Sequence, residues 1–560
     1  MDVRAILKDA LAQSYDLPES FSFSPPEDPS MGDLSTSFAF TLAKKERCSP
    51  HLMAQDLATK LQGHPDVQPL VEKVVAQGGY VNVFLRPLVW QEILLEILRQ
   101  QHNYGHQTRM RCEKVNVEYV SANPTGPLHA AHARVALMGD VIANLLKALG
   151  YEVVREFYMN DAGVQIDTLI QSISCHIKAL SEGKQAIIPA GCYPGTYLED
   201  LAREFLAQGQ DLTNLKALTL SAMMEDIQRD MESLGIFHDV FTSERALHQA
   251  GQLESMLQRL QEKELAMIGV LPPPQGQEDN HWKPEPLLLF RSSLFGDEQD
   301  RPLQRADGSW TYFAGDLAYH WDKIKRGYGI LIDVWGADHA SHVERMQYAL
   351  KALTGKDLEV VICQMVHFSD QGVPLKMSKR AGTFLTLRDV LALIGVDALR
   401  FMLLTKKAES HLNLDIERMK EQTKDNPVFY VNYAYARCCS VLRAASSYFS
   451  PKELTPLALR EQANLSLLDD FSLVKILSEW PHQLQQAAVL REPHRIPTFL
   501  MRLAHGFHAV WQKGNAEGSM RFLQSDNLAQ TYANLALLQA VAFVLESGFN
   551  LLGVTLKKEM

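Results

Sequence analysis

Three features common in membrane and secreted proteins are missing from this sequence of 560 residues. It contains no apolar run of roughly eighteen residues, so we expect no segment that crosses a membrane. The first residues carry acidic side chains and no apolar core, so we expect no secretory signal. The seven cysteines are scattered and form no C-x-x-C pair. This pattern predicts reduced thiols in a cytoplasmic protein, and it argues against a zinc ribbon or a disulfide framework.

An excess of positive charge is also absent. The chain carries 55 Lys and Arg against 66 Asp and Glu, a formal net charge of −11 at pH 7. Because phosphate affinity is built from Lys and Arg, this balance argues against indiscriminate binding of nucleic acid and allows only a local RNA-binding surface. The apolar content of 46% is ordinary for a globular protein, and the length predicts three or four domains.

Periodicity divides the chain into three parts and predicts a multidomain α/β fold. Residues 1–110 predict a small α+β domain. Residues 111–395 predict a Rossmann-like parallel-sheet domain, because "KVNVEYVSA", a loop, a helical run ending at Gly150 and "YEVVREFYM" form a βαβ unit. A helical insertion interrupts this domain at about 160–280. Residues 396–560 predict an all-α bundle, with "NLALLQAVAFVLESGFNLLG" at its centre.

Two histidines lie three residues apart in "NPTGPLHAAHAR", where the loop meets the predicted helix. His129 and His132 would share a helix face as two metal ligands do, but Ala130 and Ala131 stand where an H-E-x-x-H motif has its Glu. Two buried core histidines are the other simple interpretation. The junction of loop and helix favours an anion, because free backbone N–H groups and the helix dipole meet there. We therefore predict that both imidazoles donate to phosphates, with no metal ligands.

A basic segment, "GVPLKMSKRAGTFLTL", follows about 250 residues later. Lys376, Lys379 and Arg380 lie in a predicted loop before a helix that Thr386 caps, with Asp389 reaching back. Alone, such a segment is most simply a solvated basic turn. Together, "HAAH" and "KMSK" on these elements resemble the paired signature of class I aminoacyl-tRNA synthetases.

Within that class the chain resembles the arginyl-tRNA synthetases over most of its length. The resemblance rests on "VNVEYVSANPTGPLHAAHAR", "REFYMNDAGVQI", "YPGTYLEDLA", "FGDEQDRPLQRADGSWTYFAGDLAYH", "DVWGADHASHVERM", "KMSKRAGTFLTLRDV", "GVDALRF" and "DNPVFYVNYAYAR". It implies an N-terminal domain that contacts tRNA and a DALR-type anticodon-binding domain. It also implies a reaction in which arginine and ATP give arginyl-adenylate and pyrophosphate, followed by transfer to tRNA(Arg). The family generally activates arginine only with tRNA bound, and Mg²⁺ is the expected counter-ion of ATP.

The resemblance also implies roles for single residues. His129, His132, Lys376 and Lys379 are expected to be catalytic, with the lysines closing over the departing pyrophosphate. The expected ATP contacts are Pro124, Gly126, His129, Ala131, His132, Gly336, Asp338, Lys376, Met377, Ser378 and Lys379. A structural cap is the equal alternative for Asp338.

A guanidinium is met best by carboxylates, which accept its planar fork of donors. The expected arginine contacts are Glu118, Ser121, Asn123, Tyr312 and Asp316. Asp316 and Tyr312 are expected at the guanidinium end, and Ser121 and Asn123 at the amino-acid end. A solvated strand face is the alternative for Glu118, and a core aromatic the alternative for Tyr312.

Two departures from the family pattern stand out. Ala131 occupies a place that is usually glycine, which predicts a somewhat weakened ATP site. "HASH" replaces the more common "HHGY", and we expect neither change to touch a proposed charge partner. Two alternatives stay open, a non-catalytic tRNA-binding relative and a nucleotidyltransferase acting on a small molecule. Nothing signals an obligate oligomer, so we expect a monomer that does not bind membranes.

Overall fold

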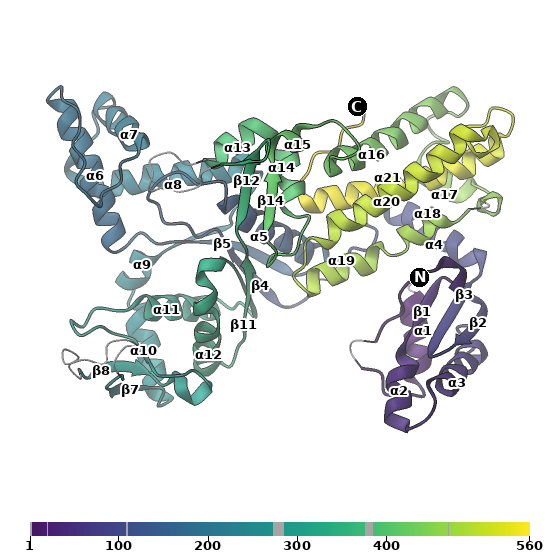
Figure 1. Ribbon diagram of the computed structural model, residues 1–560, viewed down its shortest axis with the longest axis horizontal. Coiled ribbons are helices and arrows are strands. Elements are labelled where there is room, and N and C mark those ends of the chain that lie inside the picture. The colour runs from purple at the N-terminus through teal and green to yellow at the C-terminus, as the bar shows by residue number, and fades with distance from the viewer. Residues whose placement is uncertain (1–2, 19–20, 108–109, 273–284, 376–384, 469) are drawn as a thin grey trace.

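The structure, a computed structural model, describes residues 3–18, 21–107, 110–272, 285–375, 385–468 and 470–560. It consists of an N-terminal part, a central parallel sheet surrounded by helices, and a helical C-terminal part (Figure 1). This arrangement confirms the predicted multidomain α/β class. The domain boundaries after residues 110 and 395 stay predictions.

The N-terminal part is a three-stranded antiparallel sheet, in the order β1-β3-β2, with helices packed against it. Its elements are α1 (Val3–Ala12), β1 (Leu34–Thr36), α2 (Phe38–Glu46), α3 (Pro50–Gly63), β2 (Val71–Gln77) and β3 (Tyr80–Leu85). The helix α4 (Pro87–Gln100) then leads away and packs against the C-terminal helices. Figure 1 shows this part in purple beneath those helices.

The central sheet has five strands in the order β11-β10-β4-β5-β6, and every neighbouring pair is parallel. The strands are β4 (Lys114–Tyr119), β5 (Glu152–Met159), β6 (Val240–Ser243), β10 (Ile330–Gly336) and β11 (Leu358–Cys363). The helices α5 (His132–Ala148), α11 (Tyr312–Lys325) and α12 (Val343–Thr354) connect or cover them. The predicted βαβ unit is thus β4, α5 and β5. Since parallel strands end at one edge, residues that follow β4, β5 and β10 converge there.

The stretch at about 160–280 is mostly helical as expected, but it also contains two short strands. It holds α6 (Val164–Ser181), α7 (Thr196–Ala207), α8 (Leu215–Ser233), α9 (Glu244–Gln249), α10 (Gln252–Glu262) and β7 (Ala266–Gly269). It also holds β6, which belongs to the central sheet. This strand is short, lies at the sheet edge and is only half-buried, so its residues carry no strong apolar pattern. The strand β8 (Leu287–Phe290) pairs with β7, and β9 (Arg301–Pro302) pairs with β8.

Residues after β11 form a second small sheet and then helices. The sheet contains β12 (Val366–Asp370), β13 (Val373–Pro374) and β14 (Leu412–Asp415), so one strand interrupts the stretch predicted to be all helical. The short helices beside it are α13 (Leu387–Ile394), α14 (Val396–Leu403) and α15 (Ile416–Lys420). The predicted capping box at the start of α13 is confirmed, because Thr386 and Asp389 exchange side-chain and backbone hydrogen bonds.

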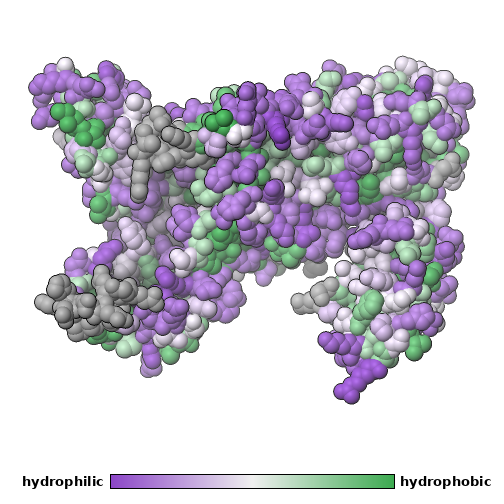
Figure 2. All heavy atoms as spheres, in the orientation of Figure 1, coloured by the Kyte–Doolittle hydropathy of each residue, from purple (hydrophilic) through white to green (hydrophobic). Residues whose placement is uncertain are grey.

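The C-terminal bundle consists of α16 (Pro427–Ala444), α17 (Pro456–Gln462), α18 (Ser472–Leu477), α19 (Trp480–Val489), α20 (Arg495–Ala516) and α21 (Leu528–Leu552). By length and composition α21 could cross a membrane, but 83% of its apolar window is buried inside the protein. It packs against α4, α16, α17 and α20, which confirms its predicted central place. On the face in Figure 2, hydrophilic residues predominate over these helices and apolar ones are scattered among them.

Candidate active site

The loop that follows β4 begins with a strained turn. The Ser121 N–H donates to the Tyr119 carbonyl at 3.1 Å, which closes a γ-turn around Val120. Val120 and Ser121 have φ values of 71° and 41°, a region that β-branched residues rarely enter. The Ser121 hydroxyl donates to Glu118 Oε1 at 2.8 Å and accepts from the Tyr158 N–H at 3.1 Å. The turn is therefore tied to β4 and β5 through one hydroxyl.

Beneath this turn, three carboxylates lie side by side across the sheet. Asp333 on β10, Glu118 on β4 and Glu156 on β5 are register neighbours, and they are 0%, 4% and 0% exposed. Lys323 and Arg326, from the end of α11, cover the row. Lys323 Nζ lies 2.6 Å from Glu118 Oε2 and 3.0 Å from Asp333 Oδ1. Arg326 donates to both oxygens of Glu156, at 2.7 and 3.0 Å.

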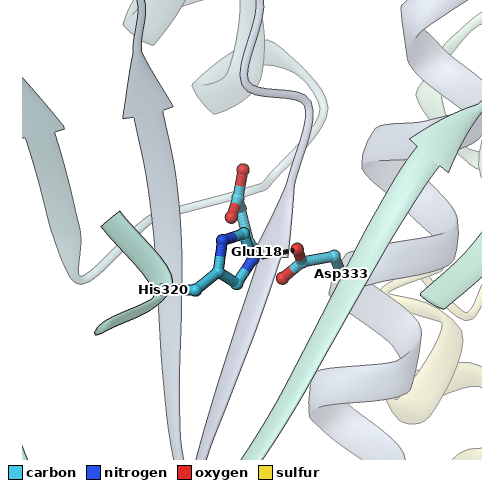
Figure 3. Close-up of side chains that lie close together, drawn as sticks. All are labelled: Glu118, His320 and Asp333. Carbon is cyan, nitrogen blue, oxygen red and sulfur yellow. Dashed lines mark hydrogen bonds and ion pairs between the residues drawn. The ribbon is translucent and has the colours of Figure 1, made fainter. Parts of the chain in front are cut away.

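His320 links the network to the Asp316 backbone on α11. Its Nε2 lies 2.7 Å from Asp333 Oδ2, and its Nδ1 lies 2.7 Å from the Asp316 carbonyl oxygen. Burial acts to raise the pKa of Asp333, but Lys323 and His320 outweigh it and lower that pKa. Burial raises the pKa of Glu118, against the attraction of Lys323. Figure 3 shows how Glu118, His320 and Asp333 converge.

These three side chains offer donor atoms close enough to hold a metal ion, since the atoms lie within 4.8 Å of one another. However, the Lys323 ammonium contacts two of the three donor groups, and that side chain is completely buried. Lys323 therefore supplies the positive charge that a metal would bring. The network fits a structural role between α11 and the central sheet.

The two predicted histidines lie together at the start of α5. Their rings stack with centroids 3.7 Å apart, and the His129 N–H donates to His132 Nδ1 at 3.2 Å. An Nδ1 that accepts leaves the proton of a neutral His132 on Nε2. Both residues are only half-buried, which disfavours the interpretation as core histidines. Ala131, the N-cap of α5, is also half-buried, whereas Pro124 and Gly126 are buried.

Residues 128–130, called the histidine loop, are hydrogen-bonded to residues 385–387 at the start of α13. The Ala130 N–H donates to the Leu385 carbonyl at 3.1 Å, and the Leu387 N–H donates to the Leu128 carbonyl at 2.9 Å. His129 and Thr386 form an isolated antiparallel bridge between these bonds. The predicted ATP contacts Lys376, Met377, Ser378 and Lys379, together with Arg380, lie outside the described residues.

Two predicted glycines have little free space around them. A Cβ on Gly126, whose φ is 154°, would lie 3.0 Å from the Tyr197 ring. Tyr197, on α7, also donates through its hydroxyl to the Thr125 carbonyl at 2.6 Å. A Cβ on Gly336 would lie 2.5 Å from Asp338 Oδ1. The side chain of Asp338 is 80% exposed, just past the end of β10.

Three acidic side chains near the start of α11, Asp316, Glu244 and Asp161, interact electrostatically and are called the acidic cluster. Tyr312 and Asp316 are one turn apart on α11, and Tyr312 is 60% exposed, which excludes the core-aromatic alternative. The solvated alternative for Glu118 is wrong, because that side chain is buried in the network. Asn123 Nδ2 donates to Gln165 Oε1 at 2.7 Å. Of the five predicted arginine contacts, Glu118 lies in β4 and Ser121 and Asn123 follow that strand, while Tyr312 and Asp316 are in the first part of α11.

One departure from the family pattern contacts Asp316, a proposed charge partner of arginine. His342, the last residue of "HASH", places Nε2 3.0 Å from Asp316 Oδ2. The expectation that neither change would reach a charge partner is thus wrong for His342. The 3₁₀ turn at Ala337–His342 brings the imidazole over α11 in a way that no local pattern indicates.

Sequence reasoning missed Glu244, at the start of α9. Burial, followed by the charges of Asp316 and Asp161, raises the pKa of Glu244 to about 7. It also missed Lys323 and His320, although a signal was present. Asp316, His320 and Lys323 are spaced i, i+4 and i+7, so they form one polar stripe on a helix that packs on the sheet.

Comparison with known proteins gives three matches to protein families along the chain. Residues 1–85 match the family described as arginyl tRNA synthetase N terminal domain. Residues 93–188 match tRNA synthetases class I (R), catalytic domain, and residues 431–560 match the DALR anticodon binding domain. Together these matches cover parts of all three regions of the fold.

Curated relatives match almost the whole chain. The arginine–tRNA ligase of Parvibaculum lavamentivorans is 44% identical over 96% of this chain and 94% of its own. That of Rhodospirillum rubrum is 42% identical with the same coverages.

Solved structures share the fold. The Thermus thermophilus arginyl-tRNA synthetase has a TM-score of 0.71 at 21% identity, covering 100% of this chain and 99% of its own. The Plasmodium falciparum one has a TM-score of 0.72 at 16% identity, covering 100% and 98%.

Proposed function

We propose roles for the site residues from the premise that the chain belongs to the arginyl-tRNA synthetases, class I enzymes that join arginine to tRNA. Its activity is that of an arginine–tRNA ligase with ATP as substrate. The relatives extend through the anticodon-binding region, so the alternative of a small-molecule nucleotidyltransferase is not supported. We propose that tRNA(Arg) is the tRNA substrate and that Mg²⁺ accompanies ATP.

The stacked histidine pair is proposed to bind the phosphates of ATP. This proposal rests on one observation: His129 and His132 lie half-buried at the N-terminus of α5, directly bridged to the segment that follows residues 376–384. An imidazole N–H and the start of a helix both favour an anion. Lys376 and Lys379 are proposed to neutralise the pyrophosphate, and Mg²⁺ to accompany the ATP phosphates. Gly336 and Asp338 are proposed to contact adenosine.

Arginine is proposed to bind at the acidic cluster. Asp316 and Tyr312 face the guanidinium in this proposal, and Glu244 adds a second carboxylate. Burial, and then the charges of Asp316 and Asp161, raise the pKa of Glu244, and a bound cation would favour the ionised form of this carboxyl group. Ser121 and Asn123 hold the amino-acid end, while Glu118 fixes Ser121 from below.

Two steps follow from these positions. A carboxylate oxygen of arginine attacks the α-phosphorus of ATP, and the bond from that phosphorus to the pyrophosphate oxygen breaks. A ribose hydroxyl of the tRNA terminus then attacks the arginyl carbonyl and AMP leaves. Neither step needs covalent help from the protein, so alignment and charge stabilisation supply the catalysis.

The test is arginine-dependent exchange of pyrophosphate into ATP, with and without tRNA(Arg). We expect exchange only when tRNA is present. Exchange without tRNA would keep the reaction but contradict its coupling to tRNA. Absence of exchange in both conditions, with tRNA still bound, would instead favour the non-catalytic tRNA-binding relative. We also propose that the enzyme acts as a monomer in the cytoplasm, which sedimentation and cell fractionation test.

A further inference from the structure

Asp230 lies where three separate segments meet. It is near the end of α8, in the predicted insertion, and is 1% exposed. Its Oδ2 accepts a hydrogen bond from the Leu128 N–H at 3.2 Å, one residue before His129. Its Oδ1 accepts from Arg388 Nε at 2.5 Å, and Arg388 is the second residue of α13. One buried carboxylate thus contacts the histidine loop and the helix that follows residues 376–384.

Leu128 is held on both sides by this arrangement. Its N–H is bound by Asp230, and its carbonyl accepts from the N–H of Leu387, the residue before Arg388. Asp230 therefore contacts one side of the bridge between residues 128–130 and 385–387 at Leu128, and contacts Arg388, the residue that directly follows the other side. Removing its carboxylate leaves the buried Leu128 N–H without this acceptor and takes one anion away from Arg388.

Asp226, one turn earlier on α8, provides a contrast. It accepts from Arg388 Nη2 at 2.7 Å through Oδ1 and at 3.2 Å through its backbone carbonyl. Its side chain is 24% exposed. Within the described part of the chain, the Asp226 carboxylate pairs with Arg388 and Arg229 and makes no hydrogen bond or ion pair with residues 128–130. The two aspartates share one guanidinium, but only Asp230 also binds the histidine loop.

We propose that Asp230 is a positioning residue for adenylate formation, which sets the distance between the histidine loop and the segment after residues 376–384. The inference rests on the proposed function, in which the histidine pair binds the ATP phosphates and Lys376 and Lys379 neutralise the pyrophosphate. Phosphoryl chemistry of this kind depends on alignment, and a displacement of about 1 Å can lower a rate about a hundredfold. Asp230 touches no substrate in this proposal and acts through Leu128 and Arg388.

The experiment measures pyrophosphate exchange at saturating tRNA(Arg) in three full-length variants, with kcat and the KM values for ATP and arginine. For Asp230→Ala we expect kcat to fall about 10- to 100-fold, while KM for arginine stays within about twofold. Asp226→Ala is the matched control, since it also removes a carboxylate from Arg388, and its kcat is expected to stay within about threefold. Equal losses in both variants would overturn the proposal.

Asp230→Asn covers the case in which the alanine variant does not fold. Asparagine keeps the volume but has one acceptor oxygen for two donors, so we expect kcat to fall at least about threefold. A smaller loss in a variant with native circular dichroism would overturn the proposal. Lack of exchange by the unchanged chain would reject the proposed function itself. Normal exchange by both Asp230 variants would reject only the role of Asp230.

Discussion

The central sheet and the helix α21 both exclude water, but they bury different kinds of side chain. The sheet buries Asp333, Glu118 and Glu156 against Lys323 and Arg326. The helix is apolar on nearly all sides, with residues such as Leu535, Leu538, Val541, Val544 and Leu545 completely buried.

The difference shows what each region contributes. A buried ion network gains little net stability over apolar side chains of the same volume, because each charge loses its hydration. It does hold its members in fixed directions, as Lys323 holds Glu118 and Glu118 holds Ser121. Apolar packing stabilises without that directional constraint. The central sheet is therefore suited to orienting side chains near the site, whereas the C-terminal bundle mainly provides stability.

The largest effect on the free energy of unfolding is expected from Lys323→Met. This change leaves Glu118 and Asp333 buried without their shared cation, which costs about 3–5 kcal/mol in the free energy of unfolding. We expect urea denaturation to show this loss and exchange to fall with it. The control is Lys323→Met combined with Glu118→Gln, which removes one charge of each sign. Failure of the double variant to regain part of the lost stability would contradict the charge-balance argument.

Leu545→Ala tests the other half of the comparison. Truncating a fully buried leucine is expected to cost about 2–5 kcal/mol in the free energy of unfolding. Because Leu545 is not among the residues proposed to bind arginine or ATP, we expect kcat and KM for arginine in exchange to stay unchanged wherever the variant is folded. Denaturation and kinetics at the same temperature check this separation. A loss of kcat without unfolding would show that the bundle also directs the active site.

The pH dependence of arginine binding gives a smaller effect. The pKa of Glu244 is raised to about 7, chiefly by burial and then by Asp316 and Asp161. The carboxyl therefore takes a proton as pH falls through 7 and loses its attraction for the guanidinium. We expect KM for arginine to rise roughly severalfold from pH 8 to pH 6. Glu244→Gln should flatten this profile, and an equally steep profile in that variant would assign the dependence to another group.

The smallest effect is expected from Ala131→Gly. Removing the methyl group at the N-cap of α5 lets adenine approach the backbone more closely, as the usual glycine of the family does. We expect KM for ATP to fall by up to about threefold, with KM for arginine unchanged as the control. An increase in KM for ATP would show that the methyl group does not hinder the nucleotide.

The parts of the site that the sequence predicts are those whose signal is local. The alternation around Glu118, the histidine pair at a loop–helix junction and the Thr386 capping box all lie within a few residues. Lys323 and Asp230 were not predicted as site residues. They lie 205 residues from Glu118 and 102 residues from Leu128, and only the strand order and the insertion bring them together. The strand β6 was not predicted from the sequence, because an edge strand of four residues carries little apolar pattern.

The strand order also bears on synthesis of the chain by the ribosome. β4 and β5 are neighbours in sequence, but the other neighbour of β4 is β10, and Lys323 follows Glu118 by 205 residues. At about 5–20 residues per second, a nascent chain carries the Glu118 carboxylate for roughly 10–40 s before its cation is made. The exposed edge of β4 has no native partner during that interval. The charged Glu118 side chain on this strand then acts against aggregation, because an unpaired charge on an exposed strand edge disfavours pairing with a second chain.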